Sequence, residues 1–190
     1  MILFLVAVIV GIAVGLARGG SLARLEQVRL RGEAGLVFLL VLQMALPAVT
    51  TRLGVPAMLA LGAWLLAMAG LVVLALVNTR EPGMVLVALG VALNLMVIGL
   101  NAGMPVSERA LNIVARSDTV EVSDLVHRTM DDETLLPWLT DVIPVPGPRG
   151  LRGVVSIGDL LLVAGAGWFL ADAVRRGGDE VKAAGSGSHH

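Results

Sequence analysis

Five long apolar stretches constrain the fold of this chain more than any other feature. They run from Ile2 to Ala17, Ala34 to Thr50, Val55 to Val77, Met84 to Leu100, and Val154 to Val174. A membrane-spanning helix needs about 20 mostly apolar residues, and fewer where the bilayer is thin. Each stretch is expected to be a helix, because backbone groups in hydrocarbon must be paired within the chain. The sequence therefore predicts an all-α integral membrane protein with five transmembrane helices.

The composition excludes several classes of function. Hydrophobic residues make up 56% of the chain and charged residues only 15%, which is more apolar than a soluble domain needs for its core. The chain contains no cysteine, so a disulfide, a thiolate metal site and a cysteine nucleophile are all excluded. The basic residues form no run of the kind that binds nucleic acid. We expect no nucleic-acid partner and no cofactor.

The chain is expected to form one domain. No positive residue precedes the first apolar stretch, as one would in a secretory signal peptide, so this stretch is expected to remain as a span. Residues 1–176 then form a single five-helix transmembrane domain. Residues 177–190 are expected to be a cytoplasmic tail whose end, GSGSHH from Gly185, looks like a linker and the remnant of a tag. The one histidine left for chemistry is His127.

Arginine placement predicts the orientation in the membrane. The loops that follow the first and third stretches, together with the chain from Asp172 onward, carry eight positive and six negative charges. The opposite side, with Asp159 included, carries six positive and nine negative charges. Positive charges in short loops stay in the cytoplasm. The chain is therefore predicted to be a multi-pass protein of the plasma (inner) membrane, with its N-terminus outside and its C-terminus inside.

The segment from Met104 to Gly153, between the fourth and fifth stretches, is expected to form an extracytoplasmic lid lying on the bilayer. Short helices are predicted over Ser107 to Ala115 and Ser123 to Met130. A third short helix is expected after the acidic run from Asp131 to Glu133. The prolines in the phrase IPVPGP then predict an extended turn into the last span.

Glycines at a spacing of four predict close packing of helices. Gly11, Gly15 and Gly19 belong to the first stretch and its end, and Gly99 and Gly103 to the end of the fourth. Small residues at this spacing allow helix backbones to approach closely. We expect them to pack helices within one subunit rather than to form a dimer.

Polar residues near the outer ends of the last two spans predict an outward-facing polar cleft. Asp159 lies about one turn inside the last stretch, three residues after Ser156. An ionisable group at this depth is costly unless it faces the bundle or water. Asn94 and Asn101 are seven residues apart and so lie on one face of the fourth helix. With Asp141 and His127 from the lid, they are expected to gather at one level of the membrane.

Two phrases carry a resemblance to the lipoprotein signal peptidases, the aspartyl enzymes that remove the signal peptide from lipid-modified precursors. Asn101 to Ser107, NAGMPVS, is similar to their N-x-G-x-x-F-S phrase, and VVSIGDLLLVAG resembles their F-N-x-A-D-S phrase with the helix that follows it. The resemblance covers about the second half of the chain. It implies that Asp159 is one catalytic aspartate, Asp141 the candidate for the other, and Asn101 a group that orients substrate.

This chain departs from the peptidase pattern in three ways. Asp141 lacks the Asn and Arg neighbours of the family's N-x-x-D-R phrase, and Ser156 and Gly158 replace Asn and Ala in the second phrase. The family has four spans, whereas this chain is predicted to have five. The whole chain more closely resembles a family of small bacterial membrane proteins, common in actinobacteria, known as domain of unknown function 5317. NAGMPVS, the single histidine, L-x-D-V-I-P-x-P and S-I-G-D are typical of that family.

The chemistry that the peptidase resemblance implies depends on two carboxyl groups that meet. Two carboxylates within a few ångströms in a partly desolvated site cannot both ionise, so one keeps its proton while the other activates water. Asp141 and Asp159 meet only if the proline-rich turn folds back onto the last helix.

A structural interpretation stands beside each functional one. Asp159 is also explained as a first-turn acid of its helix, and Asp141 as a solvated turn residue. Asn101 is also explained as the end of a helix, and His127 as a surface residue. Asn94 is explained as a hydrogen-bonding residue between helices, and for Asn94 we prefer this structural interpretation. One histidine with carboxylates is a weak ligand set, so no metal is expected.

Two functions remain open from the sequence. The first is an aspartyl-peptidase-like protein that acts on or binds lipidated peptides at the outer face, with Asp141 and Asp159 as catalytic residues. Its expected substrate-binding residues are Asn94, Asn101, His127 and Ser156. The alternative is a non-catalytic binding or assembly subunit that recognises a membrane lipid head group or a partner helix. A channel is less favoured, since no other span carries an acid or base deep in its apolar run.

Overall fold

The computed structural model describes residues 2–115, 125–148 and 152–176. Its long helices are α1 (Ile2–Ala17), α2 (Glu33–Leu53), α3 (Ala57–Val77), α4 (Met84–Asn101) and α6 (Ile157–Arg175). Its shorter elements are η1 (Leu22–Gln27), β1 (Met104–Val106), α5 (Glu108–Ala115), β2 (His127–Thr129), η2 (Pro137–Leu139), β3 (Ile143–Val145) and β4 (Gly153–Val155). Most described residues are helical, as the apolar stretches predict.

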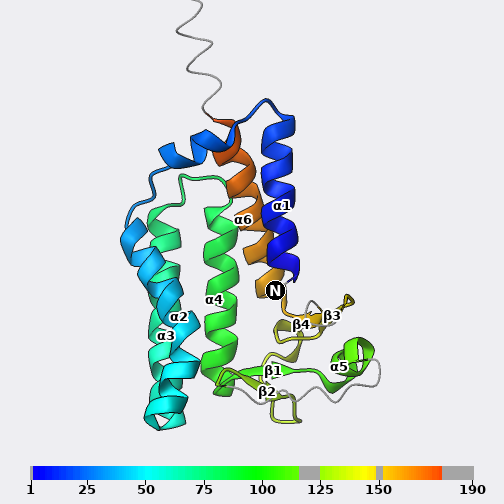
Figure 1. The fold of residues 1–190 in the computed structure, drawn as a ribbon. Helices are drawn as coiled ribbons and strands as arrows, with labels where there is room; N and C mark the ends of the chain where they lie inside the picture. Colours follow the sequence, from blue (N-terminus) through cyan, green and yellow to red (C-terminus); the bar gives the residue numbers. More distant parts are fainter. Residues whose placement is uncertain (1, 116–124, 149–151, 177–190) are drawn as a thin grey trace, which may run out of the picture.

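The five long helices form an open row. Each packs mainly on its neighbours in the order α1, α6, α4, α3 and α2, so that α1 and α2 lie at the two ends of the row (Figure 1). Four of them, α2, α3, α4 and α6, are long and apolar enough to cross a membrane. α1 has 16 residues, and at about 1.5 Å per residue it is shorter than the hydrocarbon core of about 30 Å. The structure thus supports four membrane spans, and the fifth stays a prediction.

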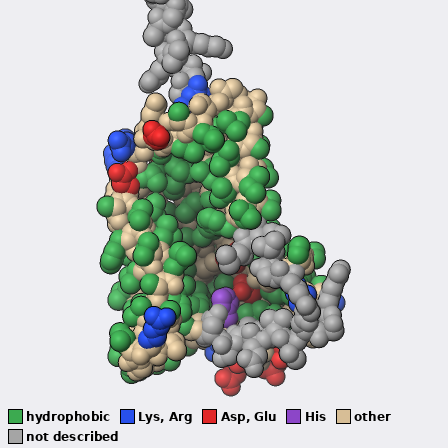
Figure 2. All heavy atoms as spheres, viewed as in Figure 1, with side chains coloured by type: hydrophobic (Ala, Val, Ile, Leu, Met, Phe, Trp, Pro, Cys, Tyr) green, Lys and Arg blue, Asp and Glu red, His purple; other side chains and the backbone are tan. Residues whose placement is uncertain are grey.

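The surface of the row is that of a membrane protein. Large apolar side chains such as Met44, Leu66 and Leu59 are well exposed. Figure 2 shows hydrophobic side chains along the helices and charged side chains near the two ends of the molecule. In water such a surface would be unfavourable, whereas lipid tails cover it without cost.

Glycines allow α1 to lie directly against α6. A Cβ atom added at Gly11 would lie 2.5 Å from the backbone oxygen of Gly167, and one added at Gly15 would lie 2.6 Å from a side-chain atom of Val174. The predicted role of these two glycines is confirmed. The prediction is wrong for Gly19 and Gly99, which have no atom within 4 Å of an added Cβ, because neither faces a neighbouring helix.

The lid departs from the all-helical prediction. β1 pairs with β2 in parallel, and β3 pairs with β4 in an antiparallel hairpin. α5 confirms the helix predicted to begin near Ser107. The helix predicted over Ser123 to Met130 is wrong where it can be checked, since His127–Thr129 is strand β2, and Ser123 itself lies outside the described residues. Pairing with β1 satisfies backbone groups that a short isolated helix would leave open.

The last part of the lid is extended, as its prolines predict. A short helix does follow the acidic run from Asp131 to Glu133, as predicted, but it is a 3-10 helix that spans only Pro137–Leu139. Before it the chain forms a turn in which Asp131 binds Thr134. β4 occupies residues that were assigned to the last span, so α6 begins at Ile157 rather than at Val154. Figure 1 shows the lid lying across the ends of α1 and α6 and beside the end of α4.

Candidate functional site

The start of α6 fixes the position of Asp159. The Ser156 hydroxyl accepts a hydrogen bond from the backbone N–H of Asp159 (3.0 Å), and the backbone N–H of Ser156 donates to Asp159 Oδ2 (3.2 Å). This reciprocal pair is a capping box, which satisfies two helix N–H groups that would otherwise lack partners. The structural interpretation of Asp159 as a first-turn acid is therefore confirmed.

Asn94 of α4 joins Asp159 to a second helix. Its Nδ2 donates to Asp159 Oδ1 at 2.7 Å, and its Oδ1 accepts from the hydroxyl of Ser156 at 3.0 Å. Ser156 is completely buried. The interhelical role expected for Asn94 is confirmed, and both carboxylate oxygens of Asp159 are occupied by hydrogen-bond donors.

Glycines bring α4 and α6 close enough for this network. A Cβ atom at Gly90 would lie 2.5 Å from the backbone oxygen of Gly158, and one at Gly158 would lie 2.0 Å from Asn94 Oδ1. Sequence reasoning missed this pair. The available signal was the spacing of Gly90 and Asn94 by four residues, which places them on one helix face.

Asn101 lies apart from Asp159 and holds the lid instead. Its Nδ2 donates to the backbone oxygens of Val97 (2.9 Å) and Leu135 (3.1 Å), and its Oδ1 accepts from the Leu135 N–H (2.8 Å). The expectation that all polar residues share one level is wrong for Asn101. The seven residues from Asn94 to Asn101 rise about 10 Å, and α6 begins beside Asn94.

Arg128 also fastens the lid, and sequence reasoning did not single it out. Its guanidinium donates to the backbone oxygen of Asn101 at 2.7 Å and pairs with Asp131. The carbonyl groups at the end of a helix lack intrahelical partners, so a nearby arginine stabilises them. The only feature of the sequence that pointed to Arg128 was its position directly after His127.

We expect Asn101→Ala to release the lid around Leu135. The substitution removes the acceptor of the Leu135 N–H and a donor to its carbonyl, which costs about 1 kcal/mol for each hydrogen bond. Amide hydrogen exchange in micelles should show faster exchange at Leu135. Asn112→Ala, an exposed amide of α5, is the matched control and should leave that exchange unchanged. Equal protection of Leu135 in both variants would contradict the assignment.

Asp141 is built into the lid by its backbone. Its N–H donates to the Pro105 oxygen at 3.0 Å, and its own oxygen accepts from the Ser107 N–H at 2.9 Å. This bridge pairs Asp141 with Val106 on the side of β1 opposite β2. The residue is only 4% exposed, so the interpretation as a solvated turn residue is wrong.

His127 lies on the same side of this small sheet as Asp141. His127 pairs with Met104, and Asp141 pairs with Val106, two residues further along β1. Side chains two residues apart on a strand point to the same face. The His127 Nε2 atom lies 3.9 Å from Asp141 Oδ2, with the imidazole 43% exposed. Figure 2 shows histidine and acidic side chains at the lower edge of a hollow in the hydrophobic surface.

The carboxyl group of Asp141 is in an unusual state. Burial, and after it the negative charge of Asp159, raises the pKa of Asp141 to about 8. Within residues 2–115, 125–148 and 152–176, no group donates a hydrogen bond to the buried Oδ1 atom. At neutral pH Asp141 therefore carries a proton. We call Asp141 and Asp159, with Asn94, Ser156 and His127, the carboxylate site.

The described part of the chain contains no group of three or more His, Cys, Asp or Glu side chains that could hold a metal ion. The carboxylate site has one imidazole and two carboxyl groups, and both oxygens of Asp159 are already occupied. What the arrangement offers chemically is a buried carboxyl group, Asp141, with a raised pKa and within reach of the charge of a second carboxyl group, Asp159.

Comparisons with known proteins agree with part of the sequence reasoning. A family model described as "Family of unknown function (DUF5317)" matches residues 27–171, which confirms the resemblance to that family. An uncharacterized protein of Thermotoga maritima is 34% identical over 89 residues. The match covers 46% of this chain, and the chain spans about half the length of that relative. No solved structure matches the chain.

Proposed function

We propose a function for this chain from the premise that it belongs to the DUF5317 family of unknown function. It is an aspartyl-peptidase-like membrane protein that acts on lipidated peptides at the outer face of the membrane. The observation that carries the proposal is the burial of Asp141, whose pKa is raised by that burial and by the charge of Asp159. A protonated and an ionised carboxyl group in one half-dry site form the pair that aspartyl chemistry requires.

The proposed setting is the cytoplasmic membrane, with the N-terminus outside and five spans. α1 is apolar along its length and packs against α6, which supports its assignment as a short fifth span. Arginines gather at the end of the row formed by η1 and the end of α6, and this end is the cytoplasmic one by the positive-inside rule. The carboxylate site then opens to the outer leaflet.

The proposed reaction is hydrolysis of a peptide bond. Asp159 takes a proton from water as the water oxygen bonds to the carbonyl carbon, and Asp141 gives its proton to the carbonyl oxygen. The carbon–nitrogen bond then breaks, the leaving nitrogen takes the proton from Asp159, and a hydroxyl of the intermediate returns a proton to Asp141. Asn94 and Ser156 hold Asp159 in place, and the partly exposed His127 lies 3.9 Å from Asp141.

A second function has its own support. Both oxygens of Asp159 accept hydrogen bonds that tie α6 to α4 and cap its first turn. A carboxylate whose two oxygens both accept hydrogen bonds within the fold has a structural role. This role favours a non-catalytic subunit that binds a lipid head group or a partner helix. In that case Asp141, whose buried Oδ1 accepts no hydrogen bond from the described residues, is the residue that meets the ligand.

Cleavage of a lipid-modified precursor peptide in micelles tests the proposal. Asp141→Asn and Asp159→Asn should each lower processing at least a thousandfold, because one removes the acid and the other the base. Asp131→Asn, an exposed lid carboxylate, is the control and should process normally. If wild-type protein leaves the precursor intact but retains lipid or peptide that Asp141→Asn loses, as measured by mass spectrometry, the binding function replaces the peptidase.

A further inference from the structure

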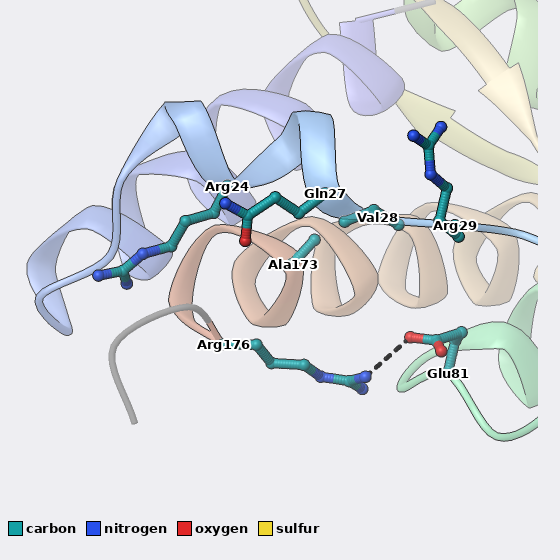
Figure 3. A pocket seen from close by; sticks show the side chains of 7 residues that line it. All are labelled: Arg24, Gln27, Val28, Arg29, Glu81, Ala173 and Arg176. Atoms are coloured by element: carbon teal, nitrogen blue, oxygen red, sulfur yellow. Dashed lines mark hydrogen bonds and ion pairs between the residues drawn. The ribbon is translucent and has the colours of Figure 1, made fainter. Parts of the chain in front are cut away.

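A pocket of about 370 Å³ lies at the arginine-rich end of the row, far from the carboxylate site. It is bounded by η1, the end of α6 and the connection between α3 and α4. Its polar lining comes from Arg24, Gln27, Arg29, Glu81 and Arg176 (Figure 3). Neither the carboxylate site nor the function proposed for it makes use of this pocket.

Two backbone contacts hold η1 over the end of α6 and so form the pocket. The Ser21 N–H donates to the backbone oxygen of Val174 at 3.0 Å, and the Arg24 guanidinium donates to the backbone oxygen of Arg175 at 2.8 Å. Gly20 permits this approach, since an added Cβ would lie 2.4 Å from the Val174 oxygen. The pocket therefore results from fixed packing of η1 on α6.

The arginines of the pocket outnumber its acids. Arg176 is paired with Glu81 at 2.9 Å and with Asp172. Arg24 donates only to backbone oxygens, and its charge meets no carboxylate within the part of the chain that the structure describes. The lining thus keeps an excess of positive charge.

The side chains surround the pocket from several directions. Figure 3 shows Arg24 and Arg176 on either side of it, with the Gln27 amide pointing from η1 toward α6. Arg29 points away at the rim. Among the described residues its acidic neighbour is Glu33, 3.9 Å distant, and both side chains are exposed. An anion in the pocket would lie within reach of Arg24 and the Gln27 amide, and Arg29 would reach it through a change of rotamer.

The chemistry that fits such a lining is a phosphate group. Guanidinium groups bind phosphate oxygens with paired hydrogen bonds, and an amide adds a further donor. Basic pockets between membrane helices at the ends of a bundle bind the head groups of anionic lipids. Large apolar side chains, among them Leu22 of η1 and Leu76 and Val77 of α3, are exposed at this end, where acyl chains would lie.

We propose that this pocket binds the phosphate of an anionic phospholipid in the leaflet that meets the arginine-rich end. The position of the pocket beside exposed apolar surface favours a lipid over free inorganic phosphate, which shares the same head-group chemistry. The bound head group would join η1, α6 and the α3–α4 connection. This binding is independent of any activity at the carboxylate site.

Native mass spectrometry of the full chain in micelles tests this site with three probes: phosphatidylglycerol, phosphatidylcholine and inorganic phosphate. We expect wild-type protein to retain phosphatidylglycerol at least tenfold better than phosphatidylcholine. R24Q/R29Q should lose that preference, while R52Q, which removes an arginine at the opposite end, should keep it. Millimolar inorganic phosphate should compete with the anionic lipid only weakly.

Three results would overturn the proposal. They are equal retention of both lipids by wild-type protein, unchanged preference in R24Q/R29Q, and binding of inorganic phosphate as tight as that of the lipid. If R24Q/R29Q fails to fold, as judged by circular dichroism, the wild-type comparison and the single R29Q variant decide. Arg29 is exposed and holds no element in place, so its replacement tests the charge alone.

Discussion

Asp141→Asn is expected to stabilise the protein at neutral pH and to remove most of the fall in its stability between about pH 4 and pH 8. The reason is that burial, and then the charge of Asp159, raises the pKa of Asp141 from 3.8 to about 8 in the folded protein. The folded state holds a proton that the unfolded chain releases. Asp141 therefore costs no stability below about pH 4, where it is protonated in both states. The free energy of unfolding falls as the pH rises from about 4 to about 8.

The size of this effect follows from the difference between the pKa of Asp141 in the folded protein and its pKa in the unfolded chain. Each pH unit between the two pKa values costs about 1.4 kcal/mol, so on the order of 4 kcal/mol is lost by pH 7. An asparagine has nearly the volume of a protonated aspartate and does not ionise, so it avoids this cost. Unfolding of the wild-type and variant proteins in micelles, followed by circular dichroism at pH 5, 7 and 9, measures the difference.

Asp131→Asn is the matched control for this experiment. Asp131 is an exposed lid carboxylate that binds Thr134 and Arg128, and these hydrogen bonds lower its pKa. Its replacement should leave the fall in stability toward alkaline pH in place. The same pH profile in Asp141→Asn and wild-type protein would show that Asp141 is not buried as described. A carboxyl group that costs this much stability is typical of a functional site.

The long helices were predictable because the bilayer allows few alternatives. α3 and α4 begin and end within two residues of the predicted stretches, since an apolar run of that length has no other stable conformation in lipid. The lid was not predictable in the same way. β2 forms because its backbone meets β1 more than twenty residues earlier in the chain, and three-residue strands leave no periodic pattern in a sequence.

The sequence singled out the residues of the carboxylate site but also grouped Asn101 with them, and it gave no information on which residues pair. The sequence indicated Asp141 and Asp159 by their chemistry and placed Asn94 and Asn101 on one helix face. Which asparagine reaches Asp159 depends on where α6 crosses α4, and that is set by Gly158. The polar pattern alone carries no information about this crossing.

Gly158→Ala is therefore expected to be among the most destabilising single changes in the bundle. The added methyl group would lie 2.0 Å from Asn94 Oδ1 and 2.9 Å from the backbone oxygen of Gly90. Either α6 moves away from α4, or Asn94 leaves its contacts with Ser156 and Asp159. Overpacking costs about 1–3 kcal/mol, and the loss of two buried hydrogen bonds, one of them to a carboxylate, adds about as much.

Gly99→Ala provides the matched control, because it introduces the same methyl group into α4. Among the described residues, no atom beyond the neighbouring backbone of α4 lies within 4 Å of a Cβ at Gly99, and alanine favours a helix over glycine by about 1 kcal/mol. Thermal unfolding in micelles should show Gly158→Ala melting well below wild-type protein and Gly99→Ala at or above it. If both variants melt alike, α4 and α6 do not meet at Gly158, and the position assigned to Asp159 beside Asn94 fails with that contact.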